Sequence, residues 1–262
     1  FVMTSTFEFI PSFDGTKLRL KRDIQEKPRA VVVISHGAGA SIDTTQYRRI
    51  EDGLVGAGYT VYFFDHRGHG QSEGLRGYYA DFSVLVNDIK FIIDLARKEN
   101  PGQKIFLFGN SMGGIGSEIL GIQKPGYVDG IILSVSAVTG KDEMPEKPED
   151  MTTEFPVPLP ESEQNAATLA NPPRRTNALG YMMGCAFYYL HDHYQEFAEP
   201  VLILCAEDDM HFKPDDMLKF YLNCASEDKV FHSYGHAPHK LFGSEAGPEA
   251  LQNMLTWLDL RA

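Results

Sequence analysis

Short apolar runs rich in β-branched residues alternate with helical patterns along this chain, and this alternation constrains the fold more than any other feature. Six runs stay apolar throughout instead of alternating with polar residues, which is typical of central strands covered on both faces. Helical segments between such strands indicate a mostly parallel sheet flanked by helices, so we predict an α/β fold. The six predicted strands are Ala30–Ser35, Tyr59–Phe64, Lys104–Phe108, Gly130–Val135, Val201–Ala206 and Lys229–Ser233.

A hairpin is predicted before these strands and two clear helices among and after them. Phe7–Ile10 and Lys17–Leu20 flank Asp14-Gly15, which is a strong hairpin signal. Apolar residues recur at a spacing of three and four over Asp81–Lys98, which predicts an amphipathic helix. A similar pattern predicts a last helix over Pro248–Leu260.

The composition changes after Val138. From Thr139 to Pro160 the chain is rich in Pro, Glu and Asp and has no clear period, and a more apolar piece follows at Ala178–Tyr189. Long loops in compact domains are usually functional or disordered. We therefore expect one domain over residues 1–262, with residues 139–196 inserted as a cap over the carboxyl edge of the sheet.

Charge and cysteine content limit the classes of partner. The chain of 262 residues has 36 acidic and 24 basic side chains and a formal charge of −12, which argues against nucleic acid and against electrostatic docking on an anionic membrane. No apolar stretch approaches the length of a membrane span, and no signal peptide precedes the first strand. Three cysteines do not form a disulfide framework and fit a reducing compartment. We expect a cytoplasmic protein, and the sequence makes no prediction of an oligomeric state.

The strongest chemical signal is the segment Gly109–Gly113 (GNSMG), which follows a predicted strand and precedes a helical pattern. It matches G-x-S-x-G in the strand-turn-helix context that this nucleophile motif of the α/β-hydrolase fold requires. A tight turn places the serine in a strained conformation, so glycines are needed on both sides. The sequence therefore predicts Ser111 as a nucleophile.

A serine nucleophile needs a histidine base and an orienting carboxylate, which follow it in the order acid, then histidine, in this fold. The strand Val201–Ala206 ends at Glu207-Asp208-Asp209. The carboxylate of Asp209 is favoured by the G-x-x-D spacing that many hydrolases of this fold have here, with Ala206 in the place of the glycine. Asp208 is the alternative.

Three histidines compete for the role of base after the last predicted strand. His232 still lies within the strand, so we expect it to be structural. His236 follows Gly235, which would let the loop turn back over the sheet, so His236 is favoured, with His239 as the alternative. The remaining histidines are expected to be structural.

The oxyanion site needs a second backbone donor beside the amide that follows the nucleophile. The segment His36–Gly39 (HGAG) follows the Ala30–Ser35 strand and is placed to supply it. We predict that the amides of Ala38 and Met112 bind the oxyanion and that Gly37 adjoins the substrate.

With these residues in place, the chain resembles the monoglyceride lipase and lysophospholipase branch of the α/β-hydrolases. His36–Gly39 looks like the family's oxyanion loop, and Asp65–Gly74, followed by Arg76-Gly77, resembles its D-H-R-G-H-G-x-S-x-G loop. Gly109–Gly114 resembles its G-x-S-M-G-G elbow, and His236–His239 is similar to its H-x-x-H, whose first histidine is catalytic. Asn171-Pro172 shows a weaker likeness to a D-P pair of the family's cap. The resemblance implies an esterase of acyl-chain substrates with His236 as base, and the Asp65–Gly70 loop is expected to be structural support.

The expected substrate is a small acyl ester of the monoacylglycerol or lysophospholipid type. Within the apolar stretch Leu179–Leu190 we expect Tyr181, Met182 and Phe187 to line the acyl pocket, since each buried methylene gains about 0.8 kcal/mol. The acidic, proline-rich first part of the cap departs from the apolar cap of a lipase, and transient contact of the cap with a membrane surface is compatible with these patterns.

Other chemistries remain as alternatives. The same triad serves amidases, aminopeptidases and thioesterases. A metal site built from His191 and His193 or from His236 and His239 has no supporting spacing, so we predict neither metal nor cofactor.

Overall fold

The structure is a computed structural model, and it describes residues 3–141, 146 and 177–262. Within these residues, eight strands form one sheet in the order β1-β2-β4-β3-β5-β6-β7-β8. Strands β3 to β8 are parallel to one another, whereas β1 and β2 form an antiparallel hairpin that pairs with β4. The predicted mostly parallel α/β fold is therefore confirmed. The strands are β1 Met3–Pro11, β2 Lys17–Gln25, β3 Val31–Ser35, β4 Thr60–Phe64, β5 Ile105–Asn110, β6 Gly130–Ser134, β7 Val201–Ala206 and β8 Lys229–Tyr234.

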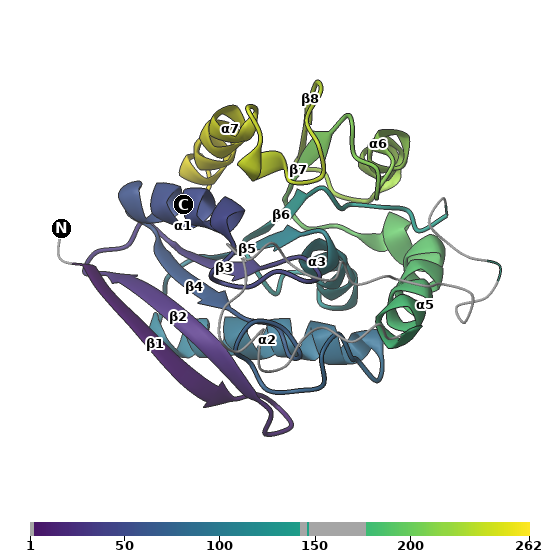
Figure 1. Cartoon of the computed structure of the whole chain (residues 1–262). Coiled ribbons are helices and arrows are strands. Elements are labelled where there is room, and N and C mark those ends of the chain that lie inside the picture. The colour runs from purple at the N-terminus through teal and green to yellow at the C-terminus, as the bar shows by residue number, and fades with distance from the viewer. Residues whose placement is uncertain (1–2, 142–145, 147–176) are drawn as a thin grey trace.

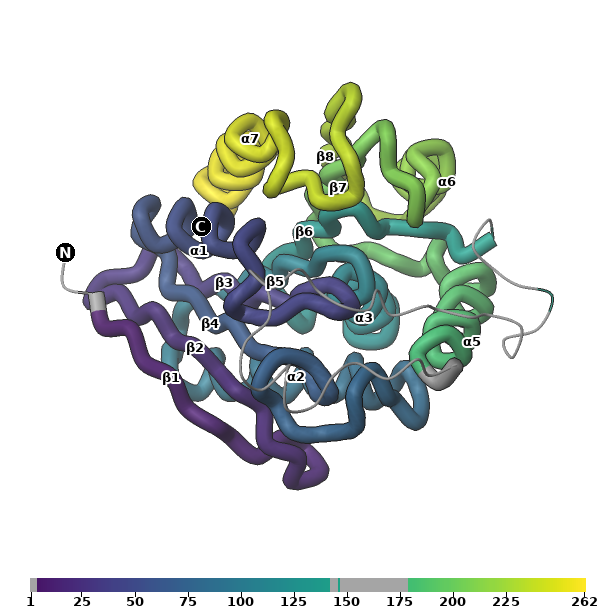
Figure 2. The backbone as a smooth tube through the Cα atoms, viewed as in Figure 1, coloured from purple at the N-terminus to yellow at the C-terminus, as the bar shows by residue number. Residues whose placement is uncertain are grey.

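Helices cover both faces of the sheet (Figure 1). Helices α1 and α7 pack together on one face, and α2 and α3 lie side by side on the other. Figure 2 shows the C-terminal helix α7 in yellow beside the blue helix α1, so the last element of the chain closes the face on which the first helix lies. The helices are α1 Thr45–Gly56, α2 Phe82–Glu99, α3 Met112–Gln123, α5 Asn177–His193, α6 Pro214–Asn223 and α7 Gly247–Asp259, with short 3₁₀ turns η3 Tyr194–Glu196 and η4 Leu241–Gly243.

Helix α2 illustrates how the sequence pattern becomes structure. Asp81 caps its first turn by accepting a hydrogen bond from the Ser83 N–H, and Arg97 and Lys98 lie in its last turn, where cations complement the helix dipole. Its predicted apolar stripe is buried against the sheet and α3. The predicted bounds Asp81–Lys98 differ from the observed ones by one residue at each end.

The core lies around the middle strands. Every residue of β3, β4, β5, β6 and β7 is buried, as the unbroken apolar runs predict. Strand β8 is the exception, because it pairs only with β7 at the edge of the sheet and most of its residues are partly exposed. The expectation that Lys229–Ser233 is a central strand is therefore wrong. The run contains polar residues, which are typical of a strand that is not buried on both faces.

Helix α5 is the largest described part of the predicted insertion. It packs against α2 and α3 beside the sheet (Figure 1). The predicted insertion begins at Thr139, whose backbone N–H donates to the Asp216 carboxylate of α6 at 2.8 Å. The acidic, proline-rich stretch lies almost entirely outside the described residues, and so does Asn171-Pro172. The division into a single domain and a cap over residues 139–196 stays a prediction.

No helix of the described part of the chain is long and apolar enough to cross a membrane.

Candidate active site

Ser111 sits on the turn between β5 and α3, where the predicted elbow places it. Its backbone adopts φ 53° and ψ −121°, in the left-handed half of conformational space that residues other than glycine rarely adopt. The Ser111 N–H donates to the Ser134 carbonyl of β6 at 3.1 Å, and the Ser111 carbonyl accepts from the Ile115 N–H at 2.9 Å. Hydrogen bonds on both sides therefore hold the strained residue in place.

The glycines on either side of Ser111 are required by close backbone approach. A Cβ atom on Gly113 would lie 2.2 Å from the Ser35 carbonyl oxygen of β3, and one on Gly109 would lie 2.7 Å from the Cα of Gly114. Both distances are far shorter than any tolerated contact, so neither position accepts a side chain. The predicted need for glycine on both sides of Ser111 is confirmed.

His239 and Asp209 complete a chain of contacts that begins at Ser111. The Nε2 atom of His239 lies 3.0 Å from the Ser111 Oγ, and its Nδ1 lies 2.8 Å from the Asp209 Oδ2. Because a carboxylate only accepts hydrogen bonds, the Nδ1 atom carries the proton and Nε2 presents its lone pair to the serine hydroxyl. This is the arrangement in which an imidazole can take a proton from serine.

The prediction that His236 is the base is wrong. The chain makes a tight turn directly after β8, closed by the Ala237 N–H donating to the Tyr234 carbonyl, and His236 lies in it with φ 56°. Its side chain is 98% exposed, and its Nδ1 atom lies 3.6 Å from the carboxylate of Asp208, which is itself 62% exposed. The turn points His236 into solvent, and the chain needs three more residues to return to the sheet edge at His239.

Of the two candidate aspartates, Asp209 is the one whose carboxylate contacts His239, and it is also the one that the spacing favours. The Asp209 side chain is fully buried, whereas that of Asp208 is 62% exposed. The second carboxylate oxygen of Asp209 accepts from the N–H groups of His211 and Phe212 at 2.7 and 3.2 Å. The Asp208 backbone N–H donates to the Ala237 carbonyl at 3.0 Å, which ties the turn after β7 to the loop that carries His239.

The loop after β3 lies directly against the serine. A Cβ atom on Gly37 would lie 3.2 Å from the Ser111 Cβ, and Ala38 follows at an exposed position. Met112 is the first residue of α3, so its N–H is one of those that no carbonyl of the helix can accept. Both predicted oxyanion donors are therefore on segments that adjoin Ser111.

A buried cluster of histidines supports this loop from behind. The rings of His66 and His69 lie 4.5 and 5.5 Å from that of His36, and all three residues are buried. Burial lowers the pKa of His36 to about 3 and that of His69 to about 4, and it lowers the pKa of His66 well below the usual value. All three imidazoles are therefore neutral at neutral pH.

The Asp65–Gly70 loop holds this cluster, in keeping with its expected supporting role. The Asp65 carboxylate accepts from the N–H groups of Ile42 and Gln71 at 2.7 and 2.9 Å. Its burial raises its pKa to about 6. These contacts join the loop after β4 to the loop after β3.

Helix α5 is linked to the His239 ring through two successive aromatic contacts. The Phe187 ring lies 6.1 Å from that of Phe212, which in turn lies 5.8 Å from the His239 ring. Met182 is fully buried, and the Tyr181 side chain lies on the outer side of the helix at 42% exposure. The lining of an acyl pocket by Tyr181, Met182 and Phe187 stays a prediction.

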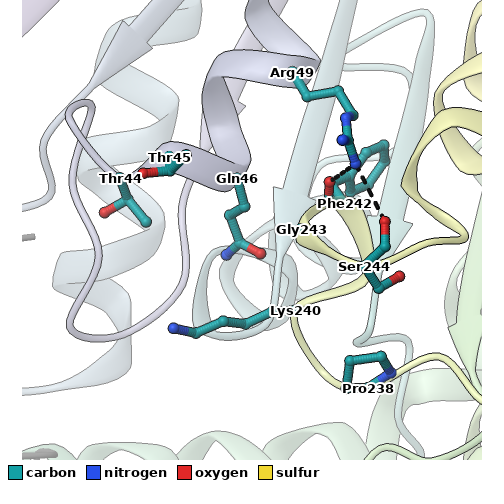
Figure 3. A pocket seen from close by; sticks show the side chains of 9 residues that line it. All are labelled: Thr44, Thr45, Gln46, Arg49, Pro238, Lys240, Phe242, Gly243 and Ser244. Atoms are coloured by element: carbon teal, nitrogen blue, oxygen red, sulfur yellow. Dashed lines mark hydrogen bonds between the residues drawn. The ribbon is translucent and has the colours of Figure 1, made fainter. Parts of the chain in front are cut away.

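A pocket lies between the start of α1 and the loop that carries His239 (Figure 3). Its volume is about 360 Å³, and sequence reasoning did not predict it because its two walls are far apart in the chain. Arg49 is held by the carbonyls of Phe242 and Ser244 on one wall, and Lys240 extends across the pocket toward the opposite wall. The lining residues are Thr44, Thr45, Gln46, Arg49, Pro238, Lys240, Phe242, Gly243 and Ser244.

Within the described residues, no group of three or more His, Cys, Asp or Glu side chains could hold a metal ion.

The fold and the Ser111–His239–Asp209 arrangement define the class, which is the α/β-hydrolases. Residues 26–246 match the family model described as serine aminopeptidase, S33, and the chain belongs to that family. This confirms the branch that the motifs resemble, because the curated relatives include monoglyceride lipases.

Two of these relatives and two solved structures show how far the similarity extends. The chain is 39% identical to human monoglyceride lipase over 106 residues, which is 40% of this chain and 34% of that protein. It is 35% identical to the monoacylglycerol lipase of Mycolicibacterium smegmatis over 115 residues, or 44% of this chain and 40% of that protein. The matched part thus spans well under half of either relative.

The solved structures agree in fold over nearly the whole chain. A soluble variant of the monoglyceride lipase from Saccharomyces cerevisiae has a TM-score of 0.73 at 24% identity, covering 100% of this chain and 96% of that one. The monoacylglycerol lipase of Paleococcus ferrophilus has a TM-score of 0.73 at 23% identity, covering 94% and 99%.

Proposed function

We propose that this protein is a serine hydrolase that cleaves carboxylic esters of acyl chains through an acyl-enzyme. The observation that carries the proposal is the continuous contact from Ser111 Oγ through His239 to the buried Asp209 carboxylate, at 3.0 and 2.8 Å. A hydroxyl, an imidazole and an orienting carboxylate at these distances are the requirements of nucleophilic acyl transfer.

The proposed reaction has two halves. Ser111 Oγ forms a bond to the ester carbonyl carbon while its proton passes to His239 Nε2. Asp209 stabilises the resulting imidazolium, and the amides of Ala38 and Met112 bind the oxyanion. The carbon–oxygen bond to the alcohol then breaks, and the alcohol takes the proton from His239. Water, activated by the same imidazole, hydrolyses the acyl-serine and releases the carboxylic acid.

The pocket beside His239 supports a substrate of the monoacylglycerol or lysophospholipid type, because polar side chains stand among a largely apolar lining. Its described lining offers hydroxyls, an amide and two cationic side chains, which suit a polyol or a phosphate ester. The acyl chain would lie toward α5, where Phe187 and Phe212 bring aromatic surface near the site. We propose residues 139–196 as the cap over this region, and contact of that cap with a membrane surface stays a prediction.

Removal of the nucleophile tests the proposal. We expect Ser111→Ala to lose hydrolysis of short p-nitrophenyl esters by a factor of about 10⁶, as in other serine hydrolases, and to lose labelling by a fluorophosphonate probe. Ser233→Ala, at an exposed serine of β8, is the matched control and should keep both. Turnover by Ser111→Ala at the rate of the unchanged protein would refute the proposal.

An aminopeptidase is the second candidate, because the family model carries that description. Such an enzyme needs carboxylates near the free amine of its substrate, whereas the nine described residues that line the pocket beside His239 include none. Turnover of a monoacylglycerol, a lysophospholipid with the same acyl chain and an aminoacyl-arylamide should be compared. We expect the arylamide to be the poorest of the three, and its preference over both esters would favour the peptidase.

A further inference from the structure

The hydrogen bonds of His36 fix which of its ring nitrogens carries the proton. Its Nε2 atom lies 3.0 Å from the backbone nitrogen of His66, and its Nδ1 lies 2.7 Å from the carbonyl oxygen of Gly37. A backbone N–H can only donate, so Nε2 accepts. A neutral imidazole with an accepting Nε2 has its proton on Nδ1, which therefore donates to the Gly37 carbonyl.

This hydrogen bond determines the direction of the next amide. The Gly37 carbonyl and the Ala38 N–H belong to the same peptide unit, which is planar, and in the trans form the two groups point in opposite directions. Holding the carbonyl down toward the buried His36 ring therefore turns the Ala38 N–H to the other side, where Ala38 is exposed. A reversed peptide would present a carbonyl to the oxyanion in place of a donor.

The peptide unit before Gly37 is held separately. The Gly37 N–H donates to the Tyr47 hydroxyl at 2.8 Å, and that hydroxyl donates to the Asn110 side-chain oxygen at 2.6 Å. Burial raises the pKa of Tyr47, which keeps the hydroxyl protonated. Asn110 immediately precedes Ser111, so these two hydrogen bonds fix the position of the Gly37 loop relative to the nucleophile. The Gly37 carbonyl of the remaining peptide accepts two hydrogen bonds, one from His36 Nδ1 at 2.7 Å and a longer one from the Ala40 N–H at 3.3 Å. His36 therefore makes the closer of the two contacts that set this peptide.

We propose that His36 is a positioning residue whose Nδ1–H locks the Gly37 carbonyl and thereby aims the Ala38 N–H at the oxyanion of the reaction. This inference rests on the proposed function and deepens it. The surroundings of His36 keep the imidazole neutral, because Tyr47, Phe63, His66 and His69 are its ring neighbours.

The first test uses the unchanged protein. Nitrogen-15 NMR of histidine-labelled protein at pH 7, assigned by comparison with His36→Asn or by through-bond correlation, distinguishes a ring protonated at Nδ1 from one protonated at Nε2. We expect the Nδ1–H form for His36. The Nε2–H form would overturn the proposal, since it leaves no proton to donate to the carbonyl.

The second test compares three variants by kcat, KM and affinity for a boronic acid that forms a tetrahedral anion on the serine. His36→Leu removes the donor, and we expect kcat to fall about 10- to 100-fold with KM changed less than about twofold, which is below the loss for a whole oxyanion donor. Boronic-acid affinity should fall by a similar factor. His36→Asn, whose amide nitrogen can occupy the place of Nδ1, should recover most of both.

His69→Gln is the matched control, because it replaces a buried imidazole of the same cluster whose Nδ1 contacts the Arg67 carbonyl and not Gly37. Equal losses of kcat in His36→Leu and His69→Gln, or a loss confined to KM, would overturn the proposal. If His36→Leu does not fold, the NMR measurement decides it. Failure of the proposed function is seen separately, as an unchanged protein without Ser111-dependent ester hydrolysis.

Discussion

The oxyanion side of the site is buried and braced, whereas the histidine that faces it comes from a loop at the edge of the sheet. His36 and Gly37 follow the central strand β3 and are fixed by hydrogen bonds to buried groups. His239 follows the edge strand β8, and its side chain is 23% exposed. The loop after a central strand is enclosed by its neighbours, whereas after an edge strand the turn geometry determines which residue returns to the site. His236 therefore lies in solvent, although His239, three residues later, contacts Ser111.

The largest expected effect separates those two histidines. His239→Ala removes the imidazole that contacts Ser111, and we expect kcat for a p-nitrophenyl ester to fall by a factor of about 10⁶. His236→Ala changes a solvent-exposed side chain and should stay within about twofold. A large loss in His236→Ala together with activity in His239→Ala would reverse the assignment of the base.

The next effect separates the two aspartates in the same way. Asp209→Asn keeps the shape but no longer fixes the tautomer of His239, so kcat should fall about 10⁴-fold. Asp208→Asn alters an exposed carboxylate and should leave kcat within about twofold. Steady-state kinetics with both variants at pH 7 makes the comparison, and equal losses would mean that the carboxylates share the role.

The smallest expected effect is a dependence of folding stability on pH, which comes from the buried histidines behind the loop after β3. The pKa values of His36 and His69, about 3 and about 4, lie below the 6.5 of an unperturbed imidazole, so the unfolded chain binds more protons as the pH falls below about 6.5. Stability is therefore present above that pH and lost toward pH 4. Between pH 7 and 5, each buried imidazole should cost on the order of 2 kcal/mol of unfolding free energy.

Asp65 acts in the opposite direction. Its pKa of about 6 lies above the unperturbed 3.8, so the folded state takes up its proton first and gains stability between pH 6 and 4, by on the order of 1 kcal/mol at pH 5. The histidines outnumber it, and urea unfolding should give a lower free energy at pH 5 than at pH 7. His69→Gln should flatten this slope, and an unchanged slope would show that the cluster is not its source.

The sequence predicted well whatever depends on close backbone packing. The elbow at Ser111 could be found because only glycine fits at Gly109 and Gly113, and the central strands because both of their faces are buried. Asp209 followed from its distance to the end of β7. These features are local, so a pattern of a few residues carries them.

The histidine could not be found in that way, because its position depends on a turn after an edge strand. Gly235 suggested a return of the chain at His236, but the turn carries that residue outward. The one usable signal lies just after His239, where Leu241 and Phe242 are buried and anchor the returning chain, whereas only Ala237 is buried directly after His236. The pocket beside His239 could not be predicted either, since α1 and the loop of His239 are distant in sequence.

The backbone of Ser111 has a further consequence. A side chain at φ 53° and ψ −121° occupies a conformation that costs on the order of 1 to 3 kcal/mol, and that amount is subtracted from the stability of the whole domain. Glycine would relieve it, so the nucleophile is the position where a more robust protein and a working one require different residues. Selection for thermal tolerance alone would therefore be expected to erode this turn before the strands that support it.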